Sequence, residues 1–248
     1  MKYKLTITPR TLHFKQPAGT SRGVYTTRKS WFVEATSDDK PGVKGVGECA
    51  PLPDLSCDAR PEYETALAQL CRMTELTGSL NRNMLRPYPS ILFGLETALL
   101  DLERGGRGQL FDTPFTRGEE GICINGLVWM GSYDEMLQRL ETKMKAGYRC
   151  VKLKIGAIDF DRELDLVRHI REAFDESKIE LRLDANGGFA PDEAMNRLEQ
   201  LAQYGIHSIE QPIKQHQWAR MAELCASTPI PIALDEELIG VNMRSMKQ

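Results

Sequence analysis

The pattern of hydrophobic and polar positions gives the first part of the chain an α+β texture. Three alternating stretches separated by turn residues predict strands of an antiparallel meander, at Tyr3–Ile7, Ser30–Thr36 and Val43–Glu48. Helical periodicity follows over Pro61–Leu76 and Pro89–Arg104. Gly105 and Gly106 would end the second helix. We therefore expect residues 1–105 to form one α+β domain.

From Ile122 onward, apolar strand-like segments alternate with amphipathic helical ones. The expected strands are Ile122–Met130, Val151–Ile155, Leu181–Asp184, Ser208–Glu210 and Ile230–Asp235. The expected helices are Tyr133–Ala146, Phe160–Phe174, Pro191–Tyr204 and Trp218–Ser227. This alternation predicts a parallel sheet with right-handed crossovers, which pattern alone allows to be an open doubly wound sheet or a closed barrel.

Charged side chains stand at the ends of four of these strands. Asp184, Glu210 and Asp235 follow one another at intervals of one βα unit. In a barrel, catalytic groups come from the C-terminal ends of several strands, whereas an open sheet concentrates its ligands at a switch point. The distribution favours a barrel, so we expect residues 106–248 to form the first five strands of an α/β (TIM-type) barrel. Carboxylates that converge in this way are typical of a Mg²⁺ site.

Two lysines lie on the strand before the first carboxylate. Lys152 and Lys154 are two positions apart and so share a face of their strand. Alone they would indicate a solvated basic face, but inside a barrel they need anions to offset their desolvation. Burial and a neighbouring cation would also lower the pKa of a lysine toward neutrality, as a general base requires. A divalent cation beside such a base suits removal of a proton α to a carboxylate.

Each carboxylate also has an ordinary structural interpretation. Asp184 precedes Ala-Asn-Gly and could form an Asx turn. Glu210 could be a strand-end charge that faces solvent, and Asp235 could start an acidic helix. The recurrence of the three at matched strand ends favours metal binding.

Composition excludes several classes of function. The chain has 248 residues, of which 41% are hydrophobic and 27% charged, with a net charge of −3. This predicts a globular protein without a nucleic-acid or membrane partner. No signal-peptide pattern is present, so we expect a cytoplasmic protein. The six cysteines show no zinc-site spacing, and we expect Cys123 and Cys150 to be buried thiols.

Four motifs resemble the enolase superfamily, in its muconate-lactonizing-enzyme-like subgroup. They are Lys152-Leu153-Lys154, Asp184-Ala185-Asn186, Glu210-Gln211-Pro212 and Asp235-Glu236. The resemblance covers nearly the whole chain and implies that residues 1–105 form a capping domain. Within the superfamily, the segments 17–23 and 47–53 are similar to the cap loops of the o-succinylbenzoate synthases.

That resemblance implies a dehydratase of menaquinone biosynthesis, which eliminates water in the syn sense from 2-succinyl-6-hydroxy-2,4-cyclohexadiene-1-carboxylate. Lys154 would remove the α-proton and later act as the acid. Lys152 would act on Lys154 electrostatically and would lie near the substrate carboxylate. Asp184, Glu210 and Asp235 would bind Mg²⁺, with Mn²⁺ as an alternative, and Asn186 would support these ligands. The partner would be a small-molecule carboxylate substrate.

Two alternatives stay open. One is an N-succinylamino acid racemase or dipeptide epimerase of the same superfamily, and the other is a non-catalytic barrel fragment. Five strands are too few to close a barrel of this type. We therefore expect a piece of a longer protein that is inactive and poorly stable alone, with a tail at 241–248 that begins a loop or helix. The sequence predicts no oligomeric state.

Overall fold

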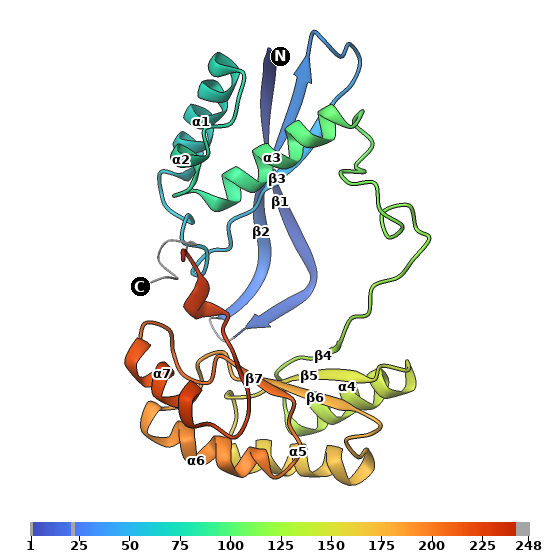
Figure 1. Cartoon of the computed structure of the whole chain (residues 1–248), viewed down its shortest axis with the longest axis vertical. Helices are drawn as coiled ribbons and strands as arrows, with labels where there is room; N and C mark the ends of the chain where they lie inside the picture. The colour runs from blue at the N-terminus through green and yellow to red at the C-terminus, as the bar shows by residue number, and fades with distance from the viewer. Residues whose placement is uncertain (1, 21–22, 242–248) are drawn as a thin grey trace. The chain divides into compact units, whose positions relative to one another are not determined.

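The computed structural model describes residues 2–20 and 23–241, which form two compact units that divide after Ile122 (Figure 1). The sequence placed a boundary between residues 105 and 106 instead. Residues 106–122 contain no helix or strand, and they belong to the first unit. The boundary therefore lies after this segment and not before it. Asp101 holds the start of this segment, accepting the amide of Gly106 at its carbonyl and that of Gly108 at its side chain.

The first unit contains an antiparallel sheet in the order β1 (Tyr3–Thr20), β2 (Gly23–Ser37), β3 (Gly45–Cys49). The meander is confirmed, but its first hairpin is much longer than the two short strands that the sequence indicated. Pairing continues from Tyr3 opposite Ser37 to Thr20 opposite Gly23, with an irregularity between His13 and Ala18. In the part of the hairpin that lies outside the predicted strands, the side chains are mostly exposed on both faces of the sheet. The sequence therefore shows no alternation of apolar and polar residues there.

Residues 17–23 are the first segment that is similar to a cap loop. Of these, residues 17–20 and 23 belong to the two strands β1 and β2. Residues 21 and 22 lie outside the described residues.

Three helices accompany this sheet: α1 (Tyr63–Thr77), α2 (Arg82–Leu85) and α3 (Pro89–Glu103). The short α2 was not predicted, because a single turn carries no periodicity; Asn81 caps its start. The expected apolar face of α3 is confirmed, with Ile91, Leu95 and Leu102 fully buried. Gly105 and Gly106 follow α3 with positive φ angles, as a helix stop requires.

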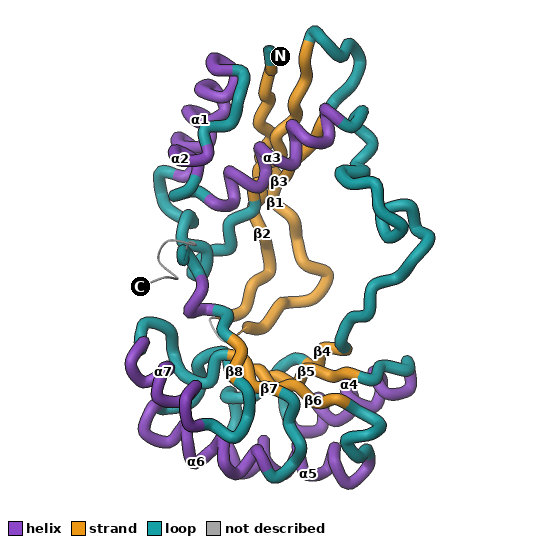
Figure 2. The backbone as a smooth tube through the Cα atoms, viewed as in Figure 1, coloured by secondary structure: helices purple, strands orange, loops and turns teal. Residues whose placement is uncertain are grey.

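The second unit is built on a parallel sheet with strands in chain order: β4 (Gly126–Val128), β5 (Cys150–Lys154), β6 (Glu180–Asp184), β7 (Ser208–Glu210) and β8 (Ile232–Ala233). The connecting helices are α4 (Tyr133–Lys145), α5 (Phe160–Ala173), α6 (Pro191–Ala202) and α7 (Trp218–Ser227). All four lie on one side of the sheet (Figure 2). This winding is that of a barrel, because a doubly wound sheet reverses its strand order and carries helices on both faces.

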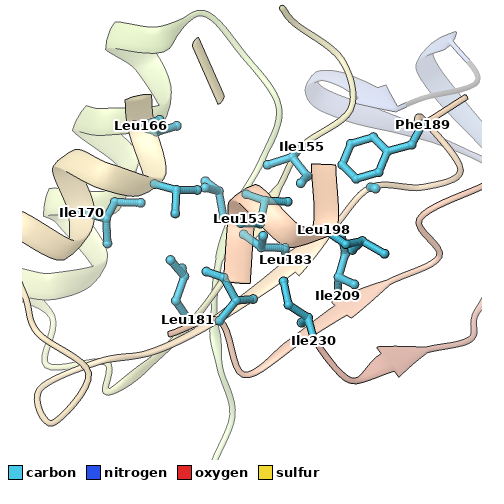
Figure 3. Packing of buried hydrophobic residues seen from close by; sticks show 14 of the residues in the cluster. Leu153, Ile155, Leu166, Ile170, Leu181, Leu183, Phe189, Leu198, Ile209 and Ile230 are labelled. Atoms are coloured by element: carbon cyan, nitrogen blue, oxygen red, sulfur yellow. The ribbon is translucent and has the colours of Figure 1, made fainter. Parts of the chain in front are cut away.

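Alternation along the strands separates the two faces of this sheet. Leu153, Leu183 and Ile209 are buried in the core that the strands share with α5 and α6 (Figure 3). The intervening residues of the same strands, including Lys152 and Lys154, therefore occupy the opposite face. The hydrophobic packing of the helices thus decides which side chains face the candidate site.

Both ends of the sheet are shorter than the sequence indicated. β4 has only three residues, since 122–125 find no ladder partner, and Cys123 is exposed rather than buried. Cys150 is partly exposed on the polar face, where its thiol donates to Glu180 Oε1 over 3.4 Å. β8 ends at Ala233, so Asp235 lies beyond the strand and directly before the 3₁₀ turn η1 (Glu236–Leu238).

All six cysteines have free thiols. No helix among residues 2–20 and 23–241 is long and apolar enough to cross a membrane.

Candidate active site

The register of the parallel sheet places the sequence-predicted residues side by side. Lys154 pairs with Asp184, and Asp184 with Glu210 on the next strand. Glu210 in turn pairs with Ala233, two residues before Asp235. The lysine and the carboxylates therefore occupy neighbouring positions at the carboxyl ends of β5 to β8.

Lys152 joins two of the carboxylates. Its Nζ lies 2.6 Å from Glu210 Oε2 and 3.1 Å from Asp184 Oδ2, and the Asp184 side chain is only 1% exposed. Burial alone would lower the pKa of Lys152, but the hydrogen bond that Lys152 donates to Glu210 and the charge of Asp184 outweigh it and raise that pKa. The expectation that burial would lower the pKa of a lysine is therefore wrong for Lys152, because its carboxylate partners favour the charged form.

Lys154 is held from three sides. Its Nζ donates to Asp184 Oδ2 over 2.9 Å and to Asn186 Oδ1 over 2.7 Å, and it lies 5.6 Å from the centroid of the Trp129 ring. Asn186 donates in turn from Nδ2 to Glu236 Oε1 over 3.3 Å. The amide of Asn186 thus fixes the Lys154 amine and ties it to the segment after β8.

Asp184 also shows the turn that its sequence suggested. Its Oδ1 accepts the backbone amide of Asn186 over 3.1 Å, which is an Asx turn, while its Oδ2 accepts from both lysines. Asn186 has a φ of 44°, in the left-handed region that Asn tolerates better than most residues. The Asx turn of Asp184 is therefore confirmed, while metal binding by the same carboxylate stays a prediction.

Negative charge accumulates around Glu210. Burial raises the pKa of Glu210, the Lys152 hydrogen bond opposes this, and the charges of Asp184 and Asp235 raise it further. The two flanking carboxylates are thus close enough to repel it. A cation bound among them would relieve that repulsion, and oxygen-only donors suit Mg²⁺. The chemistry of the donor set fits the ion.

The three carboxylates are not grouped closely enough to hold a metal ion in this structure. Within residues 2–20 and 23–241, no three His, Cys, Asp or Glu side chains are grouped so that they could hold an ion. Lys152 pairs with Asp184 and Glu210, Lys154 pairs with Asp184, and Asp235 is exposed. A metal site formed by Asp184, Glu210 and Asp235 therefore stays a prediction.

Two contacting residues were missed by the sequence. Trp129 follows β4, the strand beside β5, and Glu236 follows Asp235 directly. Trp129 could have been found from the strand order of a barrel, since it lies at the carboxyl end of the neighbouring strand. Nothing in the sequence assigns Glu236 to Asn186, because that contact depends on the shape of a loop.

Comparisons with known proteins agree for both units. Residues 19–102 match the MenC N-terminal domain family, and residues 135–246 match the enolase C-terminal domain-like family. An o-succinylbenzoate synthase of Desulfotalea psychrophila is 44% identical to this chain. The match covers 93% of this chain and 70% of that synthase. An L-Ala-D/L-Glu epimerase of Bacillus subtilis is 28% identical over 88% of this chain and 61% of the epimerase. The chain thus spans roughly two thirds of these relatives.

Solved structures give the same result. MenC from Desulfotalea psychrophila has a TM-score of 0.77 at 38% identity, covering 98% of this chain and 74% of that one. The o-succinylbenzoate synthase of Thermosynechococcus elongatus, solved with Mg in its active site, has a TM-score of 0.73 at 24% identity over 95% of this chain and 69% of that one. With the lysines and strand-end carboxylates brought together on such a sheet, the chain belongs to the enolase superfamily.

Proposed function

We propose that this chain provides the base and the metal ligands of an o-succinylbenzoate synthase, the dehydratase of menaquinone biosynthesis. The observation that carries the proposal is the Lys154 amine, fixed between Asp184 and Asn186 beside the carboxylates of the next strands. The 44% identity to a synthase supports the choice of reaction. A small-molecule carboxylate as the partner and the cytoplasm as the location are parts of the same proposal.

In this mechanism Lys154 handles the proton. As a neutral amine, its Nζ accepts the α-proton of the substrate. Lys154 then returns that proton to the hydroxyl oxygen as the C–O bond breaks, and the electron pair of the former C–H bond forms the new ring double bond. Water therefore leaves from the face on which the base stands. The contacts to Asp184 and Asn186 orient the amine for both transfers.

The other residues serve the charge that develops on the substrate. Lys152, which bridges Asp184 and Glu210, adds positive charge beside the substrate carboxylate. Asp184, Glu210 and Asp235 would hold Mg²⁺, which when bound supplies the charge that stabilises an enediolate. The synthase of Thermosynechococcus elongatus holds Mg in its active site, which supports this choice of metal.

The experiment follows dehydration of the cyclohexadiene substrate with Mg²⁺ present. It compares the chain alone with a chimera in which a C-terminal segment of the Desulfotalea psychrophila synthase follows residue 248. In the chimera, Lys154→Ala should lower kcat by roughly 10²- to 10⁴-fold, the range expected for loss of a general base. Lys178→Ala, at an exposed lysine paired only with Asp175 among the described residues, should leave kcat unchanged.

A chimera that folds and shows no dehydration would contradict the proposed reaction. Equal turnover by the Lys154→Ala variant would contradict the assignment of the base. The same assay on the chain alone tests the expectation that it is inactive by itself.

An epimerase is the second candidate, because relatives with that activity align over most of the chain. Epimerisation removes and returns a proton at the same carbon. Deuterium from solvent should then enter the α-position of a dipeptide such as L-Ala-L-Glu. Exchange into the dipeptide together with no dehydration would favour the epimerase over the synthase.

A further inference from the structure

One fully buried polar residue connects all three strand ends that carry the carboxylates. Gln211 follows Glu210 and is 0% exposed. Its backbone amide donates to Ala233 on β8 over 2.9 Å, and its carbonyl accepts from Gly187, in the loop after Asp184, over 2.7 Å. The main chain of Gln211 thus spans from the loop after β6 to the end of β8.

The side chain of Gln211 binds the segment that contains Asp235. Its Oε1 accepts the backbone amides of Asp235 and Glu237, each over 3.2 Å. Its Nε2 donates to the carbonyl of Ile213 over 3.0 Å and to Glu237 Oε2 over 3.1 Å. The full hydrogen-bonding capacity of the amide is used, two donors and two acceptor sites.

This arrangement is held against a backbone preference. Gln211 has a φ of 41°, in the left-handed region where side chains other than those of Gly and Asn are uncommon. Such a conformation persists only where the surroundings determine it, and here the buried amide does so. A glycine would adopt this φ angle at least as easily. The Gln211 side chain must therefore contribute interactions that a glycine lacks.

Asp235 is the carboxylate that most needs such support. It is exposed, and β8, the strand before it, has only two residues. The ladder therefore fixes Asp235 weakly, and the link from its own amide to Gln211 sets where the segment leaves the sheet. Glu237 strengthens this link, since its Oε1 also accepts the amide of His216, from the segment between β7 and α7, over 2.8 Å.

We propose that Gln211 is a positioning residue for the metal site, which fixes the main chain at Glu210 and Asp235 so that their carboxylates can converge on a single Mg²⁺. The inference rests on the proposed function, because it concerns the same metal. It assigns to Gln211 a part in metal affinity that is separate from any part in folding. Residues that orient metal ligands typically change affinity by roughly 10- to 100-fold when they are replaced.

The test is Mg²⁺ titration of the whole chain by calorimetry, with thermal unfolding recorded without metal. Gln211→Met removes the four side-chain hydrogen bonds with little change in size or charge, and it should weaken Mg²⁺ binding at least about 10-fold. Gln217→Met is the matched control, since the Gln217 amide donates only to the carbonyl of Lys214 among the described residues. It should bind Mg²⁺ as the unsubstituted chain does.

A double variant separates positioning from folding. Gln211→Glu combined with Glu237→Gln keeps the net charge, the acceptor for the amides of Asp235 and residue 237, and a hydrogen bond between the two side chains, and it loses only the hydrogen bond to the Ile213 carbonyl. It should bind Mg²⁺ within a few-fold of the unsubstituted chain, and it carries the test if Gln211→Met does not fold.

Each outcome decides the matter. Equal affinity in folded Gln211→Met, or a double variant that folds and binds weakly, would overturn the inference while the metal site stands. An unsubstituted chain that takes up no Mg²⁺ would overturn the proposed metal site and the inference together.

Discussion

Side-chain period and strand register determine which lysines and carboxylates of the candidate site become neighbours. Lys152 and Lys154 share a face by the two-residue period of a strand, and Asp184 and Glu210 meet through parallel pairing. The position of Trp129 follows from the strand order of a barrel. The contacts of Glu236 and Gln211 were not predictable, since each depends on the path of a loop. The raised pKa of Lys152 was not predictable either, because it follows from the distances to its carboxylate partners.

Glu163 shows how a loop beside the site is held. This carboxylate on α5 is 1% exposed, and its Oε1 accepts the backbone amides of Gly156, Ala157 and Ile158, directly after β5. Its Oε2 has no hydrogen-bond partner within the described part of the chain. Burial raises the pKa of Glu163 above its ordinary value of 4.5, although the three amides and Arg197 oppose the shift.

A pH dependence of stability follows from that pKa. Because folding raises it, the folded state favours the protonated carboxyl group, and this contribution is fully present below about pH 4.5. The contribution is lost as pH rises through the folded pKa. The free energy of unfolding of the unsubstituted chain, minus that of Glu163→Gln, should therefore be larger at pH 4 than at pH 7. Urea unfolding at the two pH values measures it, and a constant or opposite difference would refute the account.

Among the elements, the βα units were predicted far better than the first hairpin. α7 and β7 begin and end where the sequence placed them, because buried strands and amphipathic helices each carry a clear period. β1 and β2 extend well past their predicted limits, since exposed side chains on both faces leave no pattern to read. β4 and β8 are shorter than expected because ladder pairing, not apolar content, sets their ends.

The packing of β3 on α3 depends on missing side chains. A Cβ atom at Gly47 would overlap the carbonyl oxygen of Gly94 on α3 and lie 2.8 Å from the amide nitrogen of Ala98. The backbone cannot yield as a flexible side chain could, so the strand and helix would have to separate.

Gly47→Ala should therefore lower the free energy of unfolding by about 1–3 kcal/mol, the usual cost of overpacking. Gly121→Ala is the matched control, since a Cβ there meets nothing within 4 Å and the position needs no positive φ. Urea unfolding with circular dichroism compares the two variants. Equal stabilities would show that β3 and α3 are less closely packed than described.

At the scale of the whole molecule, the chain has two units with separate hydrophobic cores, and every contact described for the candidate site lies in the second. The superfamily was predictable because four motifs keep the order and spacing of strands in one sheet. The metal site itself stays a prediction. The sequence supplies its carboxylate donors, and in this structure Lys152 pairs with two of them, Asp184 and Glu210.

The most direct test of the central claim is Mg²⁺ titration of the chain and of three isosteric variants, Asp184→Asn, Glu210→Gln and Asp235→Asn. If the carboxylates form one site, the chain binds one Mg²⁺ ion, and each variant weakens binding by roughly 10-fold or more. No uptake of Mg²⁺ by the unsubstituted chain, or unchanged affinity in all three variants, would contradict the account.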